Sequence, residues 1–588
     1  MKKNKKSPRT MKKVLKYIGK YKLLLPFTLL FALITVALTL YLPLIIGEAI
    51  NLIVGKGAVE FEALSVLLFK AIIIIAITAL SQWLMSTVNN KIAYGVARDV
   101  RRDAFLRIER LPLSYLDTKP KGDLISRIIN DTEQFSEGLL LGFTQLFTGI
   151  LTILGTLVLL LVINWKIAIA VVLLTPISLF VAKFIASKTY NMFKEQSKTK
   201  GETTALIDEM IGNQKLVKAL SLEERAVERF NEVNERLGKY SLKAIFYSSI
   251  TNPATRCINN IVYAVVALIG ALAVISAEDG AAAAFTVGEL TTLLSYATQY
   301  AKPFNEISGV VTEFQNSLAS AERVFELIEE KTEEADKEGA VDIAEADGYV
   351  SAENVYFSYT ADKPLIEKLN IDVKPGQMVA IVGPTGSGKT TLINLLMRFY
   401  DVNSGDIKVD GKSISDITKK SLRRNFGMVL QDTWLHSGTI KDNIRIGKPD
   451  ATDEEVIRAA KATHAHGFIK RLSHGYDTVI GEDDGNLSQG QRQLISIARV
   501  MLMLPPMLIL DEATSSIDTR TEMKIQDAFR EMMQGRTSFI VAHRLSTVRR
   551  ADLILVMRDG NIIEKGTHEE LLSMRGFYYE LYNSQFAH

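Results

Sequence analysis

A glycine-rich run, Gly383-Pro-Thr-Gly-Ser-Gly-Lys389-Thr390, carries the clearest chemistry in this sequence. It follows the strand-like run MVAIV and precedes the helix-like run TLINLLMRF, which is the context that a phosphate-binding loop requires. In such a loop, backbone amides and the N-terminus of the following helix surround a phosphate group. Lys389 can then reach the β- and γ-phosphates, and the Thr390 hydroxyl can bind Mg²⁺. The residues that we expect to bind a nucleotide here are Gly383, Gly386, Ser387, Gly388, Lys389, Thr390 and Thr391.

Two other strand-like runs end in residues that suit phosphate chemistry. The run MLILD ends at Asp511, and Glu512 follows it. Its four aliphatic residues are typical of a strand buried on both faces of a parallel sheet, and such sheets bind ligands at their carboxyl edge. We therefore expect Asp511 to contribute to the Mg²⁺ shell and Glu512 to polarise the attacking water. The run TSFIVA is followed by His543, which can contact the γ-phosphate or serve a structural role.

The first half of the chain has the composition of a membrane domain. Apolar residues make up 47% of the 588 residues, and they are concentrated in the half that precedes the acidic segment described below. A helix that crosses a bilayer needs roughly 20 apolar residues, and its backbone groups must be hydrogen-bonded within the segment. We predict six spanning helices, at Leu23–Ile50, Ser65–Thr87, Leu139–Trp165, Ile167–Ala186, Phe246–Ile275 and Phe285–Val310.

The charged segments around these spans predict their orientation and the domain boundaries. Residues 1–22 are rich in Lys and Arg and contain no acidic residue, which predicts a cytoplasmic N-terminus. The connections Asn89–Gly138 and Lys188–Ala244 are charged and show apolar residues at helical spacing, so we expect two helical hairpins on the same side. The acidic segment 321–348 is interpreted as a solvated linker. The expected domains are therefore residues 1–22, 23–320, 321–348 and 349–588.

The segment Asn486–Gln493, NLSQGQRQ, identifies the kind of ATPase that the second half resembles. It resembles the signature motif of ABC ATPases, and the order of the other motifs is similar to that family. The resemblance implies that Tyr359 stacks on the adenine of ATP. It also implies that Gln431, in VLQD, helps to bind the nucleotide and Mg²⁺, and that Ser515–Asp518 form the D-loop.

In ABC proteins two such domains dimerise head to tail, and each ATP lies between the glycine-rich loop of one domain and the signature of the other. The resemblance therefore implies that Ser488, Gly490 and Gln491 contact a nucleotide bound to a partner. The usual signature is LSGGQ, whereas this chain has Gln489 in place of a glycine. Together with the intact Glu512 and His543, this departure resembles the catalytic chain of heterodimeric exporters, so we favour a heterodimer over a homodimer.

The resemblance extends to the membrane half, and it implies an ABC exporter. The fold class expected is an α-helical six-span transmembrane domain plus an α/β P-loop ABC nucleotide-binding domain. In this family the hairpin tips, here Leu113–Asp117 and Gly212–Ala219, are coupling helices that dock on ATPase domains. Glu482 resembles a residue of the group that receives them. ATP would close the dimer and open a central cavity outward, and hydrolysis would reset it, provided that ATP binds the closed state better.

The cargo is defined only by class. We expect ATP-driven export of an amphipathic or hydrophobic small molecule (a drug, a lipid or a peptide) across a membrane, with the bacterial plasma membrane favoured. Polar residues in the spans either face a cavity or form hydrogen bonds between helices: Gln145, Arg256, Asn259, Asn260 and Gln299. Of these, Arg256 favours a cargo with an acidic or hydrogen-bond-accepting group.

Other functions fit the sequence less well. An ABC ATPase that acts on DNA or ribosomes is disfavoured by the six predicted spans and by a net charge of only +3. A regulatory or channel-like ABC membrane protein without efficient coupled transport remains the main alternative, although Glu512 and His543 argue against it. The single cysteine, Cys257, excludes a disulfide framework and a thiolate metal site.

Overall fold

The computed structural model describes residues 7–53, 59–275, 285–360, 363–430, 433–481, 487–511, 517–542 and 545–585. The chain divides into two compact units. The first contains Met1–Arg110 and Pro120–Glu330, and the second contains Leu111–Lys119 and Lys331–His588. A short segment from the membrane half of the sequence, Leu111–Lys119, thus belongs to the same compact unit as the C-terminal half.

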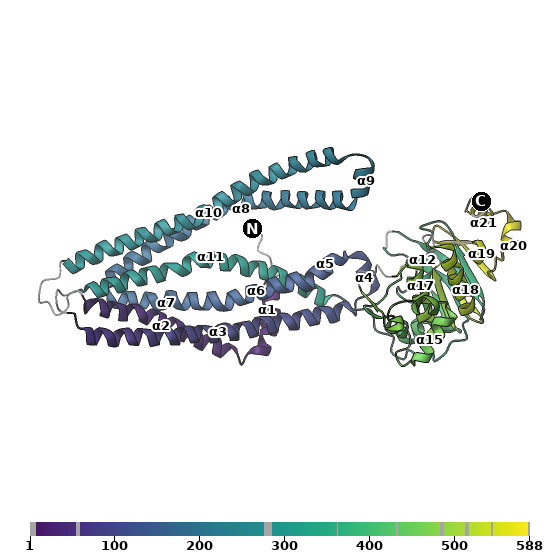
Figure 1. The fold of residues 1–588 in the computed structure, drawn as a ribbon, viewed down its shortest axis with the longest axis horizontal. Helices are drawn as coiled ribbons and strands as arrows, with labels where there is room; N and C mark the ends of the chain where they lie inside the picture. Colours follow the sequence, from purple (N-terminus) through teal and green to yellow (C-terminus); the bar gives the residue numbers. More distant parts are fainter. Residues whose placement is uncertain are drawn as a thin grey trace. The chain divides into compact units, whose positions relative to one another are not determined.

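The first unit consists of helices, most of them long (Figure 1). The helices are α1 (Ser7–Ile18), α2 (Leu25–Asn51), α3 (Phe61–Ile108), α5 (Lys121–Ser126), α6 (Thr132–Leu141), α7 (Phe147–Ile163), α8 (Trp165–Gly212), α9 (Gln214–Ala219), α10 (Glu223–Ile275) and α11 (Val287–Glu329). Figure 1 shows α8 and α10 alongside each other, joined at one end by α9. Both long connections predicted as helical hairpins are therefore helical.

Four helical segments of the described chain are long and apolar enough to cross a membrane: Leu25–Asn51, Phe61–Ile108, Lys121–Ile163 and Glu223–Ile275. In α8 a shorter apolar part, Trp165–Thr175, is present. Within the described residues α11 is not among these segments, and its sequence contains the charged residues Glu289, Lys302 and Glu306. The prediction of six spans is thus confirmed in part.

The helices of this unit pack around a buried apolar cluster. Val36 and Leu40 of α2, Leu160 of α7 and Tyr296 of α11 belong to it, together with residues of α8 and α10. The hydroxyl of Tyr296 donates a 2.6 Å hydrogen bond to the carbonyl oxygen of Leu40. Because that tyrosine is fully buried, the bond satisfies a polar group that would otherwise be costly to bury.

The second unit is an α/β domain with two larger sheets. One sheet has the order β2-β1-β4-β5, and the other has the order β12-β11-β3-β10-β9-β6. The strands are β1 (Val350–Phe357), β2 (Ile366–Val373), β3 (Met378–Val382), β4 (Ser404–Val409), β5 (Lys412–Ser413), β6 (Phe426–Val429), β7 (Gly438–Thr439), β8 (Val479–Ile480), β9 (Met507–Asp511), β10 (Thr537–Val541), β11 (Leu553–Arg558) and β12 (Asn561–Gly566). All neighbours in the six-stranded sheet pair in parallel except β11 and β12.

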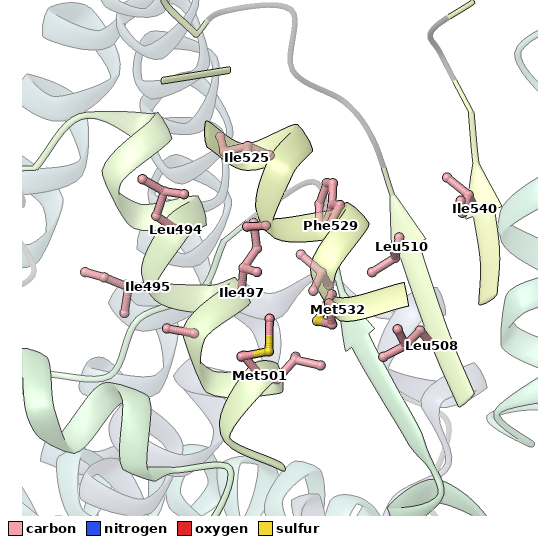
Figure 2. Packing of buried hydrophobic residues seen from close by; sticks show 14 of the residues in the cluster. Leu494, Ile495, Ile497, Met501, Leu508, Leu510, Ile525, Phe529, Met532 and Ile540 are labelled. Atoms are coloured by element: carbon pink, nitrogen blue, oxygen red, sulfur yellow. The ribbon is translucent and has the colours of Figure 1, made fainter. Parts of the chain in front are cut away.

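Helices complete the domain, and some of them, including α17 and α18, pack against the six-stranded sheet. They are α4 (Leu113–Thr118), α12 (Lys389–Leu396), α13 (Lys419–Arg424), α14 (Ile440–Arg445), α15 (Asp453–Ala462), α16 (His466–Ile469), α17 (Gln489–Met503), α18 (Thr519–Met533), α19 (Leu545–Val548), α20 (His568–Met574) and α21 (Phe577–Gln585). Figure 2 shows Ile497 of α17 and Phe529 and Met532 of α18 on the side that faces Leu508 and Leu510 of β9. The continuous apolar run of β9 is therefore buried by helices, as a parallel strand requires.

The acidic segment after the last span is attached to this domain. Helix α11 continues to Glu329, within the stretch that we interpreted as a linker. Beyond it, Glu333 pairs with Arg423 at 2.9 Å and with Lys419 at 3.3 Å. Lys337 pairs with Asp416 at 2.8 Å. The residues of this segment are mostly exposed, and some of their charges form ion pairs with basic and acidic groups of the α/β domain.

Candidate nucleotide-binding site

The carboxyl ends of the parallel strands bring the predicted motifs to one edge of the sheet. Strand β3 ends at Val382, directly before the glycine-rich loop, and β9 ends at Asp511. In the register of the sheet, Val541 at the end of β10 lies opposite Ile381 and Asp511. Segments that are far apart in sequence thus meet at the edge where parallel sheets bind ligands.

The glycine-rich loop has the backbone conformation that a phosphate cradle requires. Gly386 and Gly388 have φ angles of +83° and +98°, which are rarely adopted by residues with a Cβ. A Cβ at Gly388 would also lie 3.2 Å from the Cα of Gly560. Helix α12 begins at Lys389. Its unpaired N-terminal amides therefore point toward the loop and favour an anion there.

Lys389 supplies a partly buried cation within this loop. Its Nζ donates hydrogen bonds to the carbonyl oxygens of Gly383 at 2.8 Å and Pro384 at 2.9 Å. Burial lowers the pKa of Lys389, and the negative charge of Asp511 opposes that effect. Ser387 is buried, and its hydroxyl has no hydrogen-bond partner within the described chain. The loop therefore offers a cation and an unsatisfied hydroxyl to an anionic ligand.

A cavity of about 370 Å³ lies at this loop and brings most of the predicted residues together. It is lined by Leu365, Thr385, Gly386, Ser387, Gly388, Lys389, Thr390, Thr391, Asp511 and Val541. Its volume is within the range of small-molecule sites. Thr390 and Asp511 contribute oxygen atoms to the same cavity, and oxygen is the ligand type that Mg²⁺ prefers. The donor set therefore fits a magnesium ion bound together with phosphate.

Tyr359 lies beside this loop, as the family resemblance implies. Its hydroxyl is 3.0 Å from Oγ1 of Thr391 in α12. Its ring packs edge-on against Phe357, with centroids 4.9 Å apart. Tyr359 is 48% exposed, so part of its ring is free to stack on a planar base.

The signature residues lie elsewhere in the domain. Ser488 caps the N-terminus of α17: its Oγ accepts a hydrogen bond from the backbone N of Gln491 at 3.3 Å, and the backbone N of Ser488 donates a 2.9 Å bond to Oε1 of Gln491. Gly490 is buried, and a Cβ there would lie 2.5 Å from Cγ2 of Thr521 in α18. Ser488, Gly490 and Gln491 do not line the cavity at the glycine-rich loop. Gln489 is exposed at the start of α17.

Three predicted residues of the catalytic and metal site lie outside the described residues: Gln431, Glu512 and His543. They follow closely on the described strands β6, β9 and β10, respectively. Glu482, which we assigned to the coupling-helix contact, also lies outside the described chain. Their assignments stay predictions.

Sequence reasoning missed one residue beside Tyr359. Tyr400 packs edge-on against the Tyr359 ring with centroids 5.0 Å apart, and its hydroxyl donates a 2.5 Å hydrogen bond to Oδ2 of Asp117 in α4. Asp117 had been assigned to a predicted coupling helix, but its partner had not. The aromatic pair Phe399-Tyr400 just after the loop's helix was the available signal.

The polar residues of the predicted spans have mixed environments. Asn259 and Gln299 each bury a side-chain oxygen that has no hydrogen-bond partner within the described chain. Gln145, Arg256 and Asn260 are exposed in the single chain. Lys70 lies 3.4 Å from the hydroxyl of Tyr41. Two buried acceptors without a partner in the described chain, one on α10 and one on α11, suit a polar ligand or a polar partner helix.

Comparisons with family models and with known proteins all indicate the same family. Residues 25–304 match the model of the ABC transporter transmembrane region, and residues 366–515 match the ABC transporter model. The chain is 40% identical over 534 residues to a fatty acid ABC transporter ATP-binding/permease protein of Mycobacterium bovis, covering 91% of this chain and 83% of the relative. It is 35% identical over 584 residues to a putative multidrug export ATP-binding/permease protein of Bacillus subtilis, covering 98% and 99%.

A solved structure supports the same assignment over nearly the whole length. A bacterial Atm1-family ABC exporter with ATP bound superposes with a TM-score of 0.77 at 30% identity, covering 95% of this chain and 98% of that one. The chain therefore belongs to the ABC transporter family, as an exporter-type half-transporter whose helical membrane domain is fused to an ABC ATPase domain that couples ATP hydrolysis to transport.

Proposed function

We propose that this chain is one half of a dimeric exporter that moves amphipathic or hydrophobic small molecules across the bacterial plasma membrane, with its ATPase domain and N-terminus in the cytoplasm. The cavity that joins Ser387, Lys389, Thr390 and Asp511 at the carboxyl edge of the sheet carries the proposal. The chain also has helices long and apolar enough to cross a bilayer. A nucleotide site and a membrane domain in one chain suit a transporter driven by ATP.

ATP fits the site from base to γ-phosphate. The ring of Tyr359 stacks on adenine, and the glycine-rich loop with Lys389 binds the β- and γ-phosphates. Lys389 then exchanges its two carbonyl partners for phosphate oxygens. Mg²⁺ held by Thr390, Asp511 and Gln431 would neutralise charge on the phosphates. Glu512 orients and polarises the attacking water, and His543 contacts the γ-phosphate.

The second half of each ATP site comes from a partner domain in this proposal. Ser488, Gly490 and Gln491 do not line the cavity of their own chain, so they are available to a nucleotide bound elsewhere. The N-terminus of α17 presents backbone amides suited to a phosphate of that nucleotide. Gln489 at this position favours a second, different half-transporter as the partner, in which one of the two ATP sites turns over slowly.

Coupling to the membrane domain would pass through α4 and α9, the two predicted coupling helices. Helix α4 belongs to the same compact unit as the ATPase domain. ATP can drive alternating access only if it binds the closed dimer more tightly than the open one. In this proposal, the central cavity opens and closes together with the ATPase dimer, and these short helices transmit the movement.

The relatives support a lipid-like or drug-like cargo. One is named for fatty acids and another for multidrug export, and both kinds of molecule are largely apolar. The buried, unsatisfied oxygens of Asn259 and Gln299 would accept hydrogen bonds from a cargo with a polar group. Arg256 would attract a carboxylate or another acceptor.

The decisive experiment uses the chain in inside-out lipid vesicles, with and without a co-expressed half-transporter, and follows ATP hydrolysis and uptake of a fluorescent fatty acid. Glu512→Gln is expected to retain ATP binding and to lose nearly all hydrolysis and uptake. Glu531→Gln, an exposed glutamate on α18, serves as the matched control. Wild-type turnover by Glu512→Gln would assign the catalytic role to another residue. Hydrolysis without uptake of any amphiphile would favour the regulatory or channel-like alternative.

A further inference from the structure

Tyr400 lies just beyond helix α12, within a cluster of three aromatic rings. Its ring packs edge-on against Tyr359, with centroids 5.0 Å apart and an angle of 90°. It also packs against Phe357, at 5.8 Å and 73°. Tyr359 and Phe357 contact each other at 4.9 Å and 83°. Because edge-to-face contacts are directional, each ring restrains the orientation of the other two.

The hydroxyl of Tyr400 connects this cluster to α4. It donates a 2.5 Å hydrogen bond to Oδ2 of Asp117, a residue 283 positions away in the sequence. A bond from a hydroxyl to a carboxylate is charge-assisted and is stronger than a bond between neutral groups. Burial raises the pKa of Tyr400, and the bond to Asp117 raises it further. The hydroxyl therefore remains a donor throughout the physiological pH range.

The backbone on either side of Tyr400 is fixed by other contacts. The side chain of Arg398 is only 6% exposed and donates to Oδ1 of Asp401 at 2.9 Å. Arg423 donates to the carbonyl oxygen of Arg398 at 2.9 Å and pairs with Glu333 of the acidic segment. Because this turn is held on two sides, a displacement of α4 acts on the Tyr400 side chain more than on the turn.

We propose that Tyr400 is a positioning residue that ties the adenine-stacking ring of Tyr359 to helix α4, so that adenine binding and the placement of α4 are energetically linked. The inference rests on the proposed function, because it takes Tyr359 as the adenine platform. The link is reciprocal: if adenine favours the observed position of α4, that position strengthens adenine binding by the same factor. Occupation of the phosphate loop reaches Tyr359 indirectly, through the bond between its hydroxyl and Thr391, whereas adenine contacts the ring itself.

The test separates the base from the phosphates. Hydrogen exchange of the amides in residues 111–119 is measured in the full chain in lipid nanodiscs, with ATP, with inorganic tripolyphosphate, or with no ligand. Both ligands should slow exchange in residues 383–391, because both occupy the phosphate loop. Only ATP should slow exchange in 111–119, by about 5-fold or more, which is the lower end of typical coupling between sites.

Two variants assign the effect to the Tyr400 hydroxyl. Tyr400→Phe keeps the ring cluster and removes the bond to Asp117, so it should lose most of the ATP-dependent protection of 111–119. Asp117→Asn weakens the same bond, and the double variant should lose no more than either single variant. Tyr349→Phe is the matched control, because Tyr349 donates a similar 2.6 Å bond to Asp372 in the same domain. In the Tyr349→Phe variant, the ATP-dependent protection of residues 111–119 should equal that of the wild type.

The outcomes distinguish this inference from the proposed function. If ATP fails to protect residues 383–391, the nucleotide site itself is wrong. A different result is that ATP protects residues 383–391 and also protects residues 111–119 equally in Tyr400→Phe and in the wild type. In that case only the role of Tyr400 is overturned. Equal protection of 111–119 by tripolyphosphate and ATP would also overturn it, because the base would then contribute nothing.

Discussion

At the scale of single residues, the nucleotide site contains polar groups that form weaker hydrogen bonds within the chain than they would form with phosphate. Lys389 donates to two backbone carbonyl oxygens, and Ser387 buries a hydroxyl without a partner in the described chain. Carbonyl oxygens carry partial charge, whereas phosphate oxygens carry a full negative charge. Ligand binding therefore improves the electrostatic environment of groups that folding has already buried.

Replacing Lys389 with Ala should weaken ATP binding about tenfold or more. A hydrogen bond to a charged group contributes about 1.5–3 kcal/mol, and each 1.4 kcal/mol corresponds to a factor of ten. Equilibrium binding of a fluorescent ATP analogue measures the change. Lys408→Ala, which removes an ion pair between Lys408 of β4 and Glu353 of β1, is the control and should bind as the wild type does. Equal affinities for the two variants would contradict the role of Lys389.

At the scale of elements, α17 and α18 hold the signature segment against the sheet. Phe529 on α18 is 1% exposed and packs within the cluster shown in Figure 2. Gly490 allows α18 to approach the N-terminus of α17, since a Cβ there would overlap Thr521. The position of Ser488 and Gln491 therefore depends on core packing as well as on the capping box.

Phe529→Ala should destabilise the ATPase domain by about 3–5 kcal/mol, the usual cost of removing a buried phenylalanine side chain. The unfolding midpoint in urea, followed in the full-length protein, gives the change. Met523 lies on the same helix and is 60% exposed, so Met523→Ala should change the midpoint little. A destabilisation as large in the Met523 variant would mean that α18 is held by contacts other than the buried cluster.

At the scale of the whole molecule, the chain combines a helical membrane domain with an ATPase domain, and we propose that this domain holds only part of each nucleotide site. The loop residues line the cavity, whereas Ser488, Gly490 and Gln491 lie apart from it. We propose that a second ATPase domain completes each nucleotide site. In the proposal, that domain belongs to a different half-transporter.

The oligomeric state follows from the ATPase rate and mass of the chain purified alone in lipid nanodiscs. We expect an inactive or monomeric chain that becomes active when a suitable second half-transporter is co-expressed. The matched control is the same chain carrying Gln489→Gly, which restores the usual signature. An active dimer of the wild-type chain, silenced by Glu512→Gln, would show that the transporter is a homodimer and that Gln489 has no bearing on partner choice.

The sequence predicted the elements whose physical cause is local. The glycine-rich loop was expected between a strand and a helix, and the structure has β3, the loop and α12 in that order. The apolar segments predicted helices because a bilayer leaves few other solutions. The six-span count is confirmed only in part, and α11, whose sequence contains Glu289 and Lys302, is not among the apolar segments of the described chain.

By itself, the sequence determined the family, the phosphate loop and the helical membrane half, because each is encoded by a contiguous run of residues. Only the tertiary structure decided which distant groups meet. It placed Asp117 against Tyr400 across 283 positions, and it paired the acidic residue Glu333 with Arg423, 90 positions away. Such contacts depend on how separate elements pack, and no local pattern of residue types specifies them.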